Sequence, residues 1–357
     1  MVDVLVVDDS FLMRKMVIAA LESNTKIRVV GTAEDGAQAL RSLEKLQPDV
    51  VILDVEMPIM DGLEALTEIR RKDRHLPVLM FSSLTQRGAQ ITIEALTRGA
   101  SDYMGKPSQV NDPEQAQQIL REELVPKVLA LGERAQARKA RTAPEASPSP
   151  VVRRPMPKRE VSSMGVPGVD AVCVGVSTGG PVALASLIEN WKQPLPVPVF
   201  VVQHMPPRFT QLLADRLGSL GIMPVQEAYD GQQALPGQIY LAPGGWHMVL
   251  ERRSDKVFIR VVDLPPCNSC KPAVDLLFES AAKVYGARLL AVVMTGMGTD
   301  GLQGSRSIVE TGGEVWAQDQ ATSVVWGMPG AVAQAGLASA VLALPEIPVE
   351  VARRVQP

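Results

Sequence analysis

Short apolar runs alternate with amphipathic segments along the first third of the chain. The strand-like runs, rich in β-branched residues, cover residues 4–7, 27–33, 50–53, 78–81 and 102–104. Between and after them, helical spacing covers residues 14–21, 36–46, 63–71, 91–98 and a last segment from 114 to 130 or beyond. This alternation predicts a parallel sheet that is covered by helices on both faces.

The pattern breaks at about residue 140 and resumes near residue 169. The intervening segment is rich in proline, serine and basic residues and has little apolar periodicity, which predicts an extended, semi-rigid linker. Buried-strand runs then return at 171–176, 197–202 and 289–294, with helical segments at 181–189, 208–217 and 273–285. We therefore predict two doubly wound α/β domains over 1–125 and 169–350, joined by a helix end and linker over 126–168.

Composition narrows the class of protein. The 357 residues include 46% hydrophobic residues, enough for real cores, and the formal net charge of -3 does not suggest a nucleic-acid partner. Three cysteines do not form a disulfide framework, so a reducing compartment is the simpler interpretation. No segment resembles a signal peptide or a membrane span, and we expect a cytoplasmic protein.

Three aspartates follow predicted strands of the first domain. Asp8 and Asp9 come directly after the first strand, and Asp54 ends the third. The carboxyl ends of parallel strands meet at one edge, where sites of this fold class form. Converging carboxylates repel one another, and a hard cation such as Mg²⁺ relieves that repulsion and neutralises a transferred phosphoryl group.

Two further strand ends complete this acidic pocket. Lys106 ends the fifth strand, where its ammonium could pair with Asp54, and Ser82 ends the fourth, where its hydroxyl could bond a phosphoryl oxygen. Tyr103 could change its position when that hydroxyl moves. Each residue alone is often an ordinary loop, turn or cap residue. Their joint placement on four strand ends indicates one site.

The second domain carries a serine between a predicted strand and a helix. The run from Gly175 to Pro181 (GVSTGGP) lets the chain turn sharply and expose the hydroxyl of Ser177. The helix that follows offers free N–H groups and the positive end of its dipole to an oxyanion. On this motif alone, a glycine-rich phosphate-binding turn is an equally good interpretation.

A serine nucleophile needs a base and an orienting carboxylate. Among three histidines, His204 is the best placed because it follows the strand at 197–202, whereas His75 lies in the first domain and His247 in a turn. Asp300 follows the strand at 289–294 and shares the same edge, although an Asp-Gly pair is also a common turn. Three acyl-transfer residue types at three strand ends favour a triad.

Two rival functions compete with an acyl-transfer enzyme of this kind. A response regulator with a DNA-binding output domain would need a short helix-turn-helix and a basic recognition helix, which the second half lacks. A serine hydrolase of small esters remains an alternative. The order Ser, His, Asp differs from the Ser, Asp, His order of α/β-hydrolases, so the serine motif is no evidence for that family.

Residues 1 to about 125 resemble a response-regulator receiver domain, through Val7–Ser10, Leu53–Gly62 and Lys106-Pro107. The resemblance implies a flavodoxin-like fold, phosphorylation of Asp54 by a chemotaxis histidine kinase, and a cis Lys106–Pro107 bond. It also implies Mg²⁺ ligation and a switch pair. The implied residues are Asp9 and Asp54 as direct ligands, Asp8 through water, the Glu56 carbonyl, and Ser82 with Tyr103 as the switch.

Residues from about 169 to 345 resemble the catalytic domain of the protein-glutamate methylesterases of bacterial chemotaxis, the CheB family. The matching runs are 175–181, 203–209 (QHMPPRF), 241–244 (LAPG), 272–275 (PAVD) and 295–301 (TGMGTDG). The resemblance implies cofactor-free hydrolysis of glutamate methyl esters on the cytoplasmic domain of a chemoreceptor by Ser177, His204 and Asp300. Related deamidation of receptor glutamine is implied too. Backbone N–H groups of Met297 and Thr178 would hold the oxyanion.

One loop departs from the family pattern. Cys270 and Lys271 stand where the family favours histidine and arginine before Pro272. The C-x-x-C spacing of Cys267 and Cys270 is compatible with zinc or redox chemistry. Without a second Cys/His pair at a suitable spacing, the sequence alone does not support a metal there, and we expect no catalytic role for the cysteines.

Overall fold

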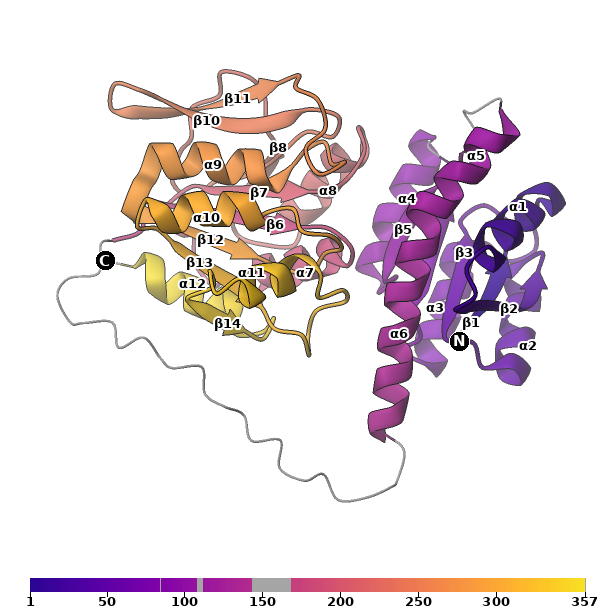
Figure 1. Ribbon diagram of the computed structural model, residues 1–357. Coiled ribbons are helices and arrows are strands. Elements are labelled where there is room, and N and C mark those ends of the chain that lie inside the picture. The colour runs from indigo at the N-terminus through magenta and orange to yellow at the C-terminus, as the bar shows by residue number, and fades with distance from the viewer. Residues whose placement is uncertain (84, 108–111, 143–167, 357) are drawn as a thin grey trace.

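The computed structural model describes residues 1–356 except 84, 108–111 and 143–167, and it contains two α/β units (Figure 1). Most of the linker expected at 140–168 therefore lies outside the described residues. No helix in the described part of the chain is both long and apolar enough to cross a membrane.

The first unit is a five-stranded parallel sheet in the order β2-β1-β3-β4-β5. This is the flavodoxin-like order, in which ligands bind at the carboxyl edge beside β1 and β3. Its elements are β1 (Val2–Val7), α1 (Phe11–Glu22), β2 (Ile27–Ala33), α2 (Gly36–Leu46), β3 (Val50–Asp54), α3 (Gly62–Lys72), β4 (Val78–Ser82), α4 (Gln86–Thr97), β5 (Asp102–Gly105), α5 (Pro113–Ile119) and α6 (Val125–Thr142).

Local sequence explains where these elements begin. Every residue of β3 and β4 is buried, as expected for strands covered on both faces. Asp61 caps α3, and its carboxylate and the Glu64 side chain form a reciprocal capping box. The single last helix expected from the sequence is divided, because a π-helical turn at Leu120–Leu124 separates α5 from α6.

The second unit contains a seven-stranded parallel sheet in the order β14-β13-β12-β6-β7-β9-β8. The chain starts at β6, builds outward to β8 and β9, and then returns to β12 on the other side of β6. The strand order reverses there, which makes the carboxyl edge of β6 and β12 the expected ligand site. Its elements are β6 (Ala171–Val176), α7 (Gly180–Glu189), β7 (Val199–Gln203), α8 (Phe209–Gly218), β8 (Val225–Glu227), β9 (Ile239–Leu241), β10 (His247–Arg253), β11 (Lys256–Val262), α9 (Val274–Tyr285), β12 (Leu289–Val293), α10 (Leu302–Glu310), β13 (Glu314–Gln318), α11 (Met328–Gln334), β14 (Ala340–Leu342) and α12 (Ile347–Val355).

An antiparallel hairpin is the main addition to the expected fold. Strands β10 and β11 pair from His247–Val262 to Arg253–Lys256 and lie beyond α9 in Figure 1. Met248, Leu250 and Ile259 of the hairpin join the same hydrophobic cluster as Phe278 of α9. The hairpin therefore packs on a helix rather than extending the sheet.

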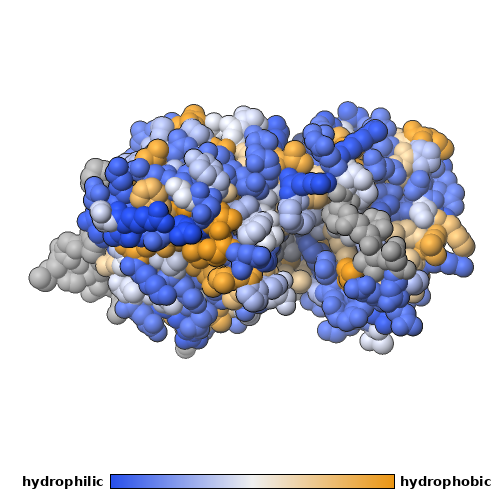
Figure 2. Space-filling view, turned by 90° about the horizontal axis from the view of Figure 1, so that it is seen from above, coloured by the Kyte–Doolittle hydropathy of each residue, from blue (hydrophilic) through white to orange (hydrophobic). Residues whose placement is uncertain are grey.

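The two units contact one another (Figure 2), through the side of the receiver-like unit that carries α4, β5 and α6 (Figure 1). Tyr103 of β5 stacks on Phe209 at the start of α8, with ring centroids 5.1 Å apart and planes 15° from parallel. Arg134 of α6 donates to the carbonyl of Ala321 at 3.4 Å. The contact thus lies close in sequence to His204, five residues before Phe209.

Candidate active site

The turn that carries Ser177 is shaped by close backbone approaches. Gly179 lies directly before α7 and has φ 77°, a conformation that favours glycine. A Cβ on Gly180 would lie 1.9 Å from the Gln203 Oε1 atom, and one on Gly296 would lie 2.9 Å from the Ser177 Cβ. Glycine at positions 180 and 296 therefore allows the β6–α7 turn, β7 and the 295–301 loop to pack closely together.

Strand register places Ser177 beside His204. Val176 of β6 pairs with Gln203 of β7, so the next residue on each strand is Ser177 and His204. The His204 N–H donates to the Val176 carbonyl at 3.2 Å, and the Ser177 N–H donates to the Thr295 carbonyl at 3.0 Å. The carboxyl ends of β6, β7 and β12 thus meet at one place.

His204 and Asp300 are joined directly. The His204 Nε2 atom lies 2.7 Å from Asp300 Oδ2, and the Asp300 side chain is 2% exposed. Burial opposes ionisation of Asp300, but hydrogen bonds from His204 and from the N–H groups of Val274 and Asp275 outweigh it and lower the pKa of Asp300. Asp300 is therefore an anion that holds one nitrogen of the imidazole.

The other imidazole nitrogen is the available base. Within the described residues, no hydrogen bond joins the Ser177 hydroxyl to His204, and the His204 Nδ1 atom lies 3.4 Å from Cys270 Sγ. Hydrogen bonds of a catalytic group are often long before substrate binds. Burial, with a smaller effect of the Asp300 charge, raises the pKa of Cys270 to about 12, so this thiol stays protonated and is a poor nucleophile.

Donors for an oxyanion lie beside Ser177. The N–H of Gly296 is used, because it donates to the Val325 carbonyl at 3.0 Å. The N–H groups of Thr178 and Met297 make no hydrogen bond to any residue that the structure describes. Both flank Ser177, one in the turn before α7 and the other in the loop that contacts it.

The acidic pocket of the first unit is assembled at the ends of β1, β3 and β5. Lys106 Nζ lies 2.7 Å from both Asp8 Oδ2 and Asp54 Oδ2. One carboxylate oxygen each from Asp8, Asp9 and Asp54 lies within 4.8 Å of the others. Hard oxygen ligands with a surplus of negative charge are the donor set that Mg²⁺ prefers, so these residues fit that ion.

Comparisons with known proteins identify the family of each unit. Residues 172–351 match the family model described as CheB methylesterase, and residues 4–118 match that of the response regulator receiver domain. A protein-glutamate methylesterase/protein-glutamine glutaminase of Trichodesmium erythraeum is 44% identical over 99% of this chain and 98% of its own length. The chain belongs to the CheB methylesterase family. A Nocardioides relative of the same name is 45% identical over 98% of this chain and 94% of its own length.

A solved structure supports the fold of the second unit of this CheB-family chain. The catalytic domain of the Thermotoga maritima CheB methylesterase is 41% identical, with a TM-score of 0.51, and covers 52% of this chain and 99% of that one. The predicted fold class of two parallel-sheet α/β domains is therefore confirmed.

Several residues that support the CheB-like site were not singled out from the sequence. Gln203 Nε2 donates to the carbonyls of Ser177 and His204 at 3.0 and 3.2 Å. Thr295 Oγ1 donates to the Thr178 carbonyl at 2.8 Å, and Asn268 Nδ2 donates to Asp300 at 3.1 Å. Gln203 and Thr295 lie inside the quoted motifs at strand ends, so the signal was present. The role of Asn268 depends on a loop that the sequence does not place.

The receiver residues are placed as follows. The Glu56 N–H approaches Asp54 Oδ1 at 3.4 Å, and the Ser82 hydroxyl donates to the Ser83 carbonyl at 3.1 Å. Tyr103 is 7% exposed and faces the second unit. The cis Lys106–Pro107 bond that the resemblance implied is wrong, because this bond is trans in the structure. Lys106 contacts both aspartates with the trans bond. Among the described residues, the cis bond is Lys271–Pro272.

Burial of Asp54 leads to a prediction about stability. Burial, opposed in part by Lys106, raises the pKa of Asp54 to about 6, above that of the unfolded chain. The stabilising contribution of this group is therefore present at low pH and is lost as the pH rises through about 6. Asp54→Asn removes the ionisation and should raise the free energy of unfolding at about pH 8 by up to about 3 kcal/mol, with little effect at about pH 4.

Thermal unfolding of the full chain in a chelator, at both pH values, measures this effect. Asp49→Asn is a matched control, for which the expected change in the free energy of unfolding has the opposite sign. Although burial opposes it, bonds from Lys139 and Gln136 lower the pKa of Asp49, so its contribution is present at neutral pH and lost on acidification. An Asp54→Asn chain no more stable than the parent at the higher pH would contradict the account.

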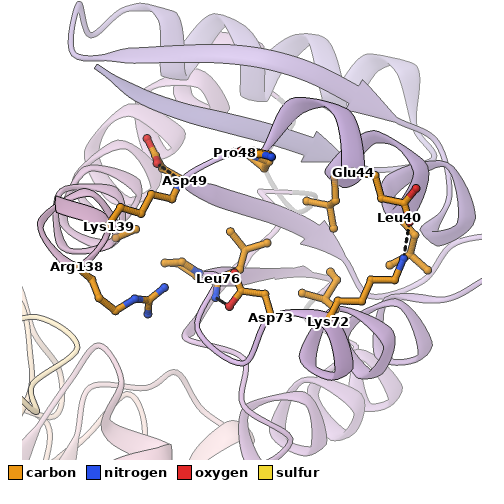
Figure 3. Close-up of a pocket in the computed structure, with 14 residues that line it drawn as sticks. Leu40, Glu44, Pro48, Asp49, Lys72, Asp73, Leu76, Arg138 and Lys139 are labelled. Atoms are coloured by element: carbon orange, nitrogen blue, oxygen red, sulfur yellow. Dashed lines mark hydrogen bonds and ion pairs between the residues drawn. The ribbon is translucent and has the colours of Figure 1, made fainter. Parts of the chain in front are cut away.

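A separate cavity of about 330 Å³ lies at the opposite edge of the receiver sheet, between α2, α3 and α6 (Figure 3). Half of its lining residues are apolar, such as Leu40 and Leu76, and the other half are polar or charged. The ion pairs Lys72–Glu44 and Lys139–Asp49 lie at its rim. The cavity contains neither the serine nor the carboxylate cluster, so it is no part of either candidate site.

Proposed function

We propose that this chain is a phosphorylation-regulated protein-glutamate methylesterase. It hydrolyses the γ-methyl esters of glutamate side chains on the cytoplasmic domain of a methyl-accepting chemoreceptor, and so serves sensory adaptation in the cytoplasm. The observation that carries this function is full-length similarity, at 44% identity, to relatives named for that activity. The convergence of Ser177, His204 and Asp300 at one sheet edge supplies the chemistry.

Ser177 attacks the ester carbonyl, and His204 accepts its proton. Because Asp300 is bonded to Nε2, the proton is accepted at Nδ1. Protonated His204 then gives the proton to the departing methoxide, which leaves as methanol. Water hydrolyses the acyl-enzyme by the same steps and returns glutamate and the free serine.

Charge stabilisation comes from three sources in this arrangement. The Asp300 carboxylate stabilises the imidazolium and holds its tautomer. The N–H groups of Thr178 and Met297 donate to the tetrahedral oxyanion, helped by the N-terminal dipole of α7. Attack on a glutamine amide forms the same kind of intermediate, so the same residues support deamidation with ammonia as the leaving group.

Phosphorylation takes place at the other pocket. Asp54 accepts a phosphoryl group from a histidine kinase, and Asp8, Asp9 and Asp54, with the Glu56 carbonyl, would hold Mg²⁺, which neutralises phosphoryl charge when bound. Lys106 and Ser82 then bond the phosphoryl oxygens. Because Lys106 already contacts Asp54 at 2.7 Å, a new anion at that position changes its contacts directly.

The Tyr103–Phe209 stack is a route by which that change reaches the esterase. Tyr103 is the proposed partner of Ser82, and Phe209 begins the helix that follows the His204 loop. In the unphosphorylated chain, the receiver domain limits access of a bulky receptor to Ser177. Phosphorylation repacks Tyr103 and weakens the docked state.

The receptor specificity is tested by comparing a methylated chemoreceptor fragment with a small chromogenic ester. The expected result is methanol release from the receptor and weak turnover of the small ester, with mass spectrometry locating the new glutamates. Efficient hydrolysis of the small ester with an untouched receptor would favour the rival hydrolase and overturn the proposal.

The close approach of Gly296 to Ser177 provides a second test. In Gly296→Ala the new Cβ would lie 2.3 Å from Met328 Sδ and 2.9 Å from the Ser177 Cβ, so the serine must shift. A misplaced nucleophile should lower the rate of methanol release by about a hundredfold. Gly218→Ala, whose Cβ has only ordinary contacts, is the control and should keep its rate. Equal rates for the two variants would show that this approach does not position Ser177.

A further inference from the structure

His247, at the start of β10, is a buried histidine that the proposed mechanism does not use. Its Nδ1 atom accepts the backbone N–H of Ala273 at 3.2 Å, and its Nε2 atom lies 3.1 Å from the Pro265 carbonyl. Because a carbonyl can only accept, the proton of the ring is on Nε2 and Nδ1 is a bare acceptor. Burial lowers the pKa of His247, which favours this neutral form.

The segment between these two contacts is a loop that borders the triad. It covers residues 265–273, and two of its side chains lie against triad residues. Asn268 Nδ2 donates to Asp300 Oδ1 at 3.1 Å, and Cys270 Sγ lies 3.4 Å from His204 Nδ1. The single buried imidazole therefore holds this loop at both ends, while the middle of the loop contacts the triad.

Ala273 is also the residue at which α9 starts. It is the N-cap, so its N–H lies directly before the first N–H groups of the helix. The N–H groups of Val274 and Asp275 donate to Asp300 Oδ2 and Oδ1, at 2.6 and 3.1 Å. The positive end of the α9 dipole therefore faces the Asp300 carboxylate. A shift of Ala273 moves both donors, and with them the carboxylate that holds His204.

We propose that neutral His247 is a positioning residue of the esterase, which acts on the triad through the start of α9. The decisive contact is the bond from the Ala273 N–H to Nδ1, because it fixes the residue that precedes the two donors to Asp300. Asp300 is then held where its Oδ2 atom meets His204 Nε2 at 2.7 Å. The effect on turnover rests on the proposed function, in which His204 accepts the proton of Ser177.

Three substitutions of His247 separate this hydrogen bond from the packing of the ring. Leucine fills much of the same space but offers no acceptor, so the buried Ala273 N–H loses its partner. Asparagine has a carbonyl oxygen about where Nδ1 lies and can accept that N–H, but its amide is too short to replace Nε2 at Pro265. Glutamine is the converse, since its amide reaches the Nε2 position and leaves the Ala273 N–H unpaired.

Turnover is tested by steady-state methanol release from a methylated receptor fragment by the full chain. His247→Leu should lower kcat by about a hundredfold with KM within about twofold of the parent, because a misplaced triad weakens the transition state more than the bound substrate. His247→Asn should recover at least about tenfold of that loss. Leu250→Ala, which truncates a buried side chain of the same strand, is the packing control and should lower Tm while leaving kcat within about twofold. If His247→Leu does not fold, His247→Gln takes its place with the same expected loss.

A second readout does not depend on the substrate. The proton that His204 Nε2 donates to Asp300 gives a far-downfield proton NMR resonance, which is assigned by its loss in Asp300→Ala. The resonance should keep its position in His247→Asn and should shift or broaden in His247→Leu or His247→Gln.

Two results would overturn the positioning role whether or not the chain is an esterase. One is an unchanged resonance in the folded leucine or glutamine variant, and the other is an equal change in the asparagine variant. A raised KM with unchanged kcat would overturn it as well, because His247 would then act on binding alone. The expected changes of the resonance in a chain whose parent releases no methanol would support the positioning role and count against the proposed function instead.

Discussion

Replacing Ser177 by alanine should lower methanol release from a methylated receptor by at least about a thousandfold. The hydroxyl is the atom that forms the acyl-enzyme, and no described neighbour can take over that step. Cys270 lies beside His204 and is an alternative nucleophile, but its raised pKa keeps it protonated. His204→Ala should be comparably severe, and Asp300→Asn less so, because the imidazole keeps its place while losing a charged partner.

A matched control separates chemistry from packing. Ser186→Ala changes a half-buried serine on α7, the helix that begins beside Ser177, and should leave the rate within about twofold of the parent. Circular dichroism should show folded chains for both variants. Near-normal methanol release from Ser177→Ala would contradict the mechanism in which Ser177 is the nucleophile.

Removing residues 1–140 should raise basal esterase activity about tenfold or more, because the free catalytic unit no longer equilibrates with a docked receiver. A bias of only about 1.4 kcal/mol toward the docked state suffices for a tenfold effect. Across this interface α4 packs against α7 and α8, and one aromatic stack and a 3.4 Å hydrogen bond from Arg134 add to that packing.

Two further variants identify the contact and the switch. Phe209→Ala in the full chain should raise basal activity in part, since it removes the Tyr103 stack, whereas Asp54→Ala should abolish stimulation by a small phosphodonor. If the isolated catalytic unit were no more active than the unphosphorylated full chain, occlusion would be wrong. The receiver would then have to act positively, for example by docking on the receptor.

The sequence was most informative where a functional polar residue directly follows a buried strand. The ends of β1, β3 and β5 predicted the grouping of Asp8, Asp54 and Lys106, and the observed 2.7 Å contacts agree with it. The register of β6 and β7 brings Ser177 and His204 together for the same reason. Parallel strands that are covered on both faces are recognisable as continuous apolar runs, and their carboxyl ends all lie at the same edge of the sheet.

Features that depend on loops or on partly exposed strands could not be predicted in this way. The β10–β11 hairpin carries charged residues on its outer face, which masks its apolar alternation. The approach of Cys270 to His204 joins residues 66 positions apart through a turn of four residues. No periodicity in the sequence encodes such a contact, so only the folded chain shows that Cys270 has a histidine beside it.

The most direct test of the central claim is methanol release from a methylated chemoreceptor fragment by the full chain, with Mg²⁺, in the presence and absence of a small phosphodonor. The account predicts release that the phosphodonor stimulates about tenfold, that Asp54→Ala renders insensitive, and that Ser177→Ala abolishes in both conditions. No methanol from the receptor under either condition, with a folded chain and a phosphorylated Asp54, would contradict it.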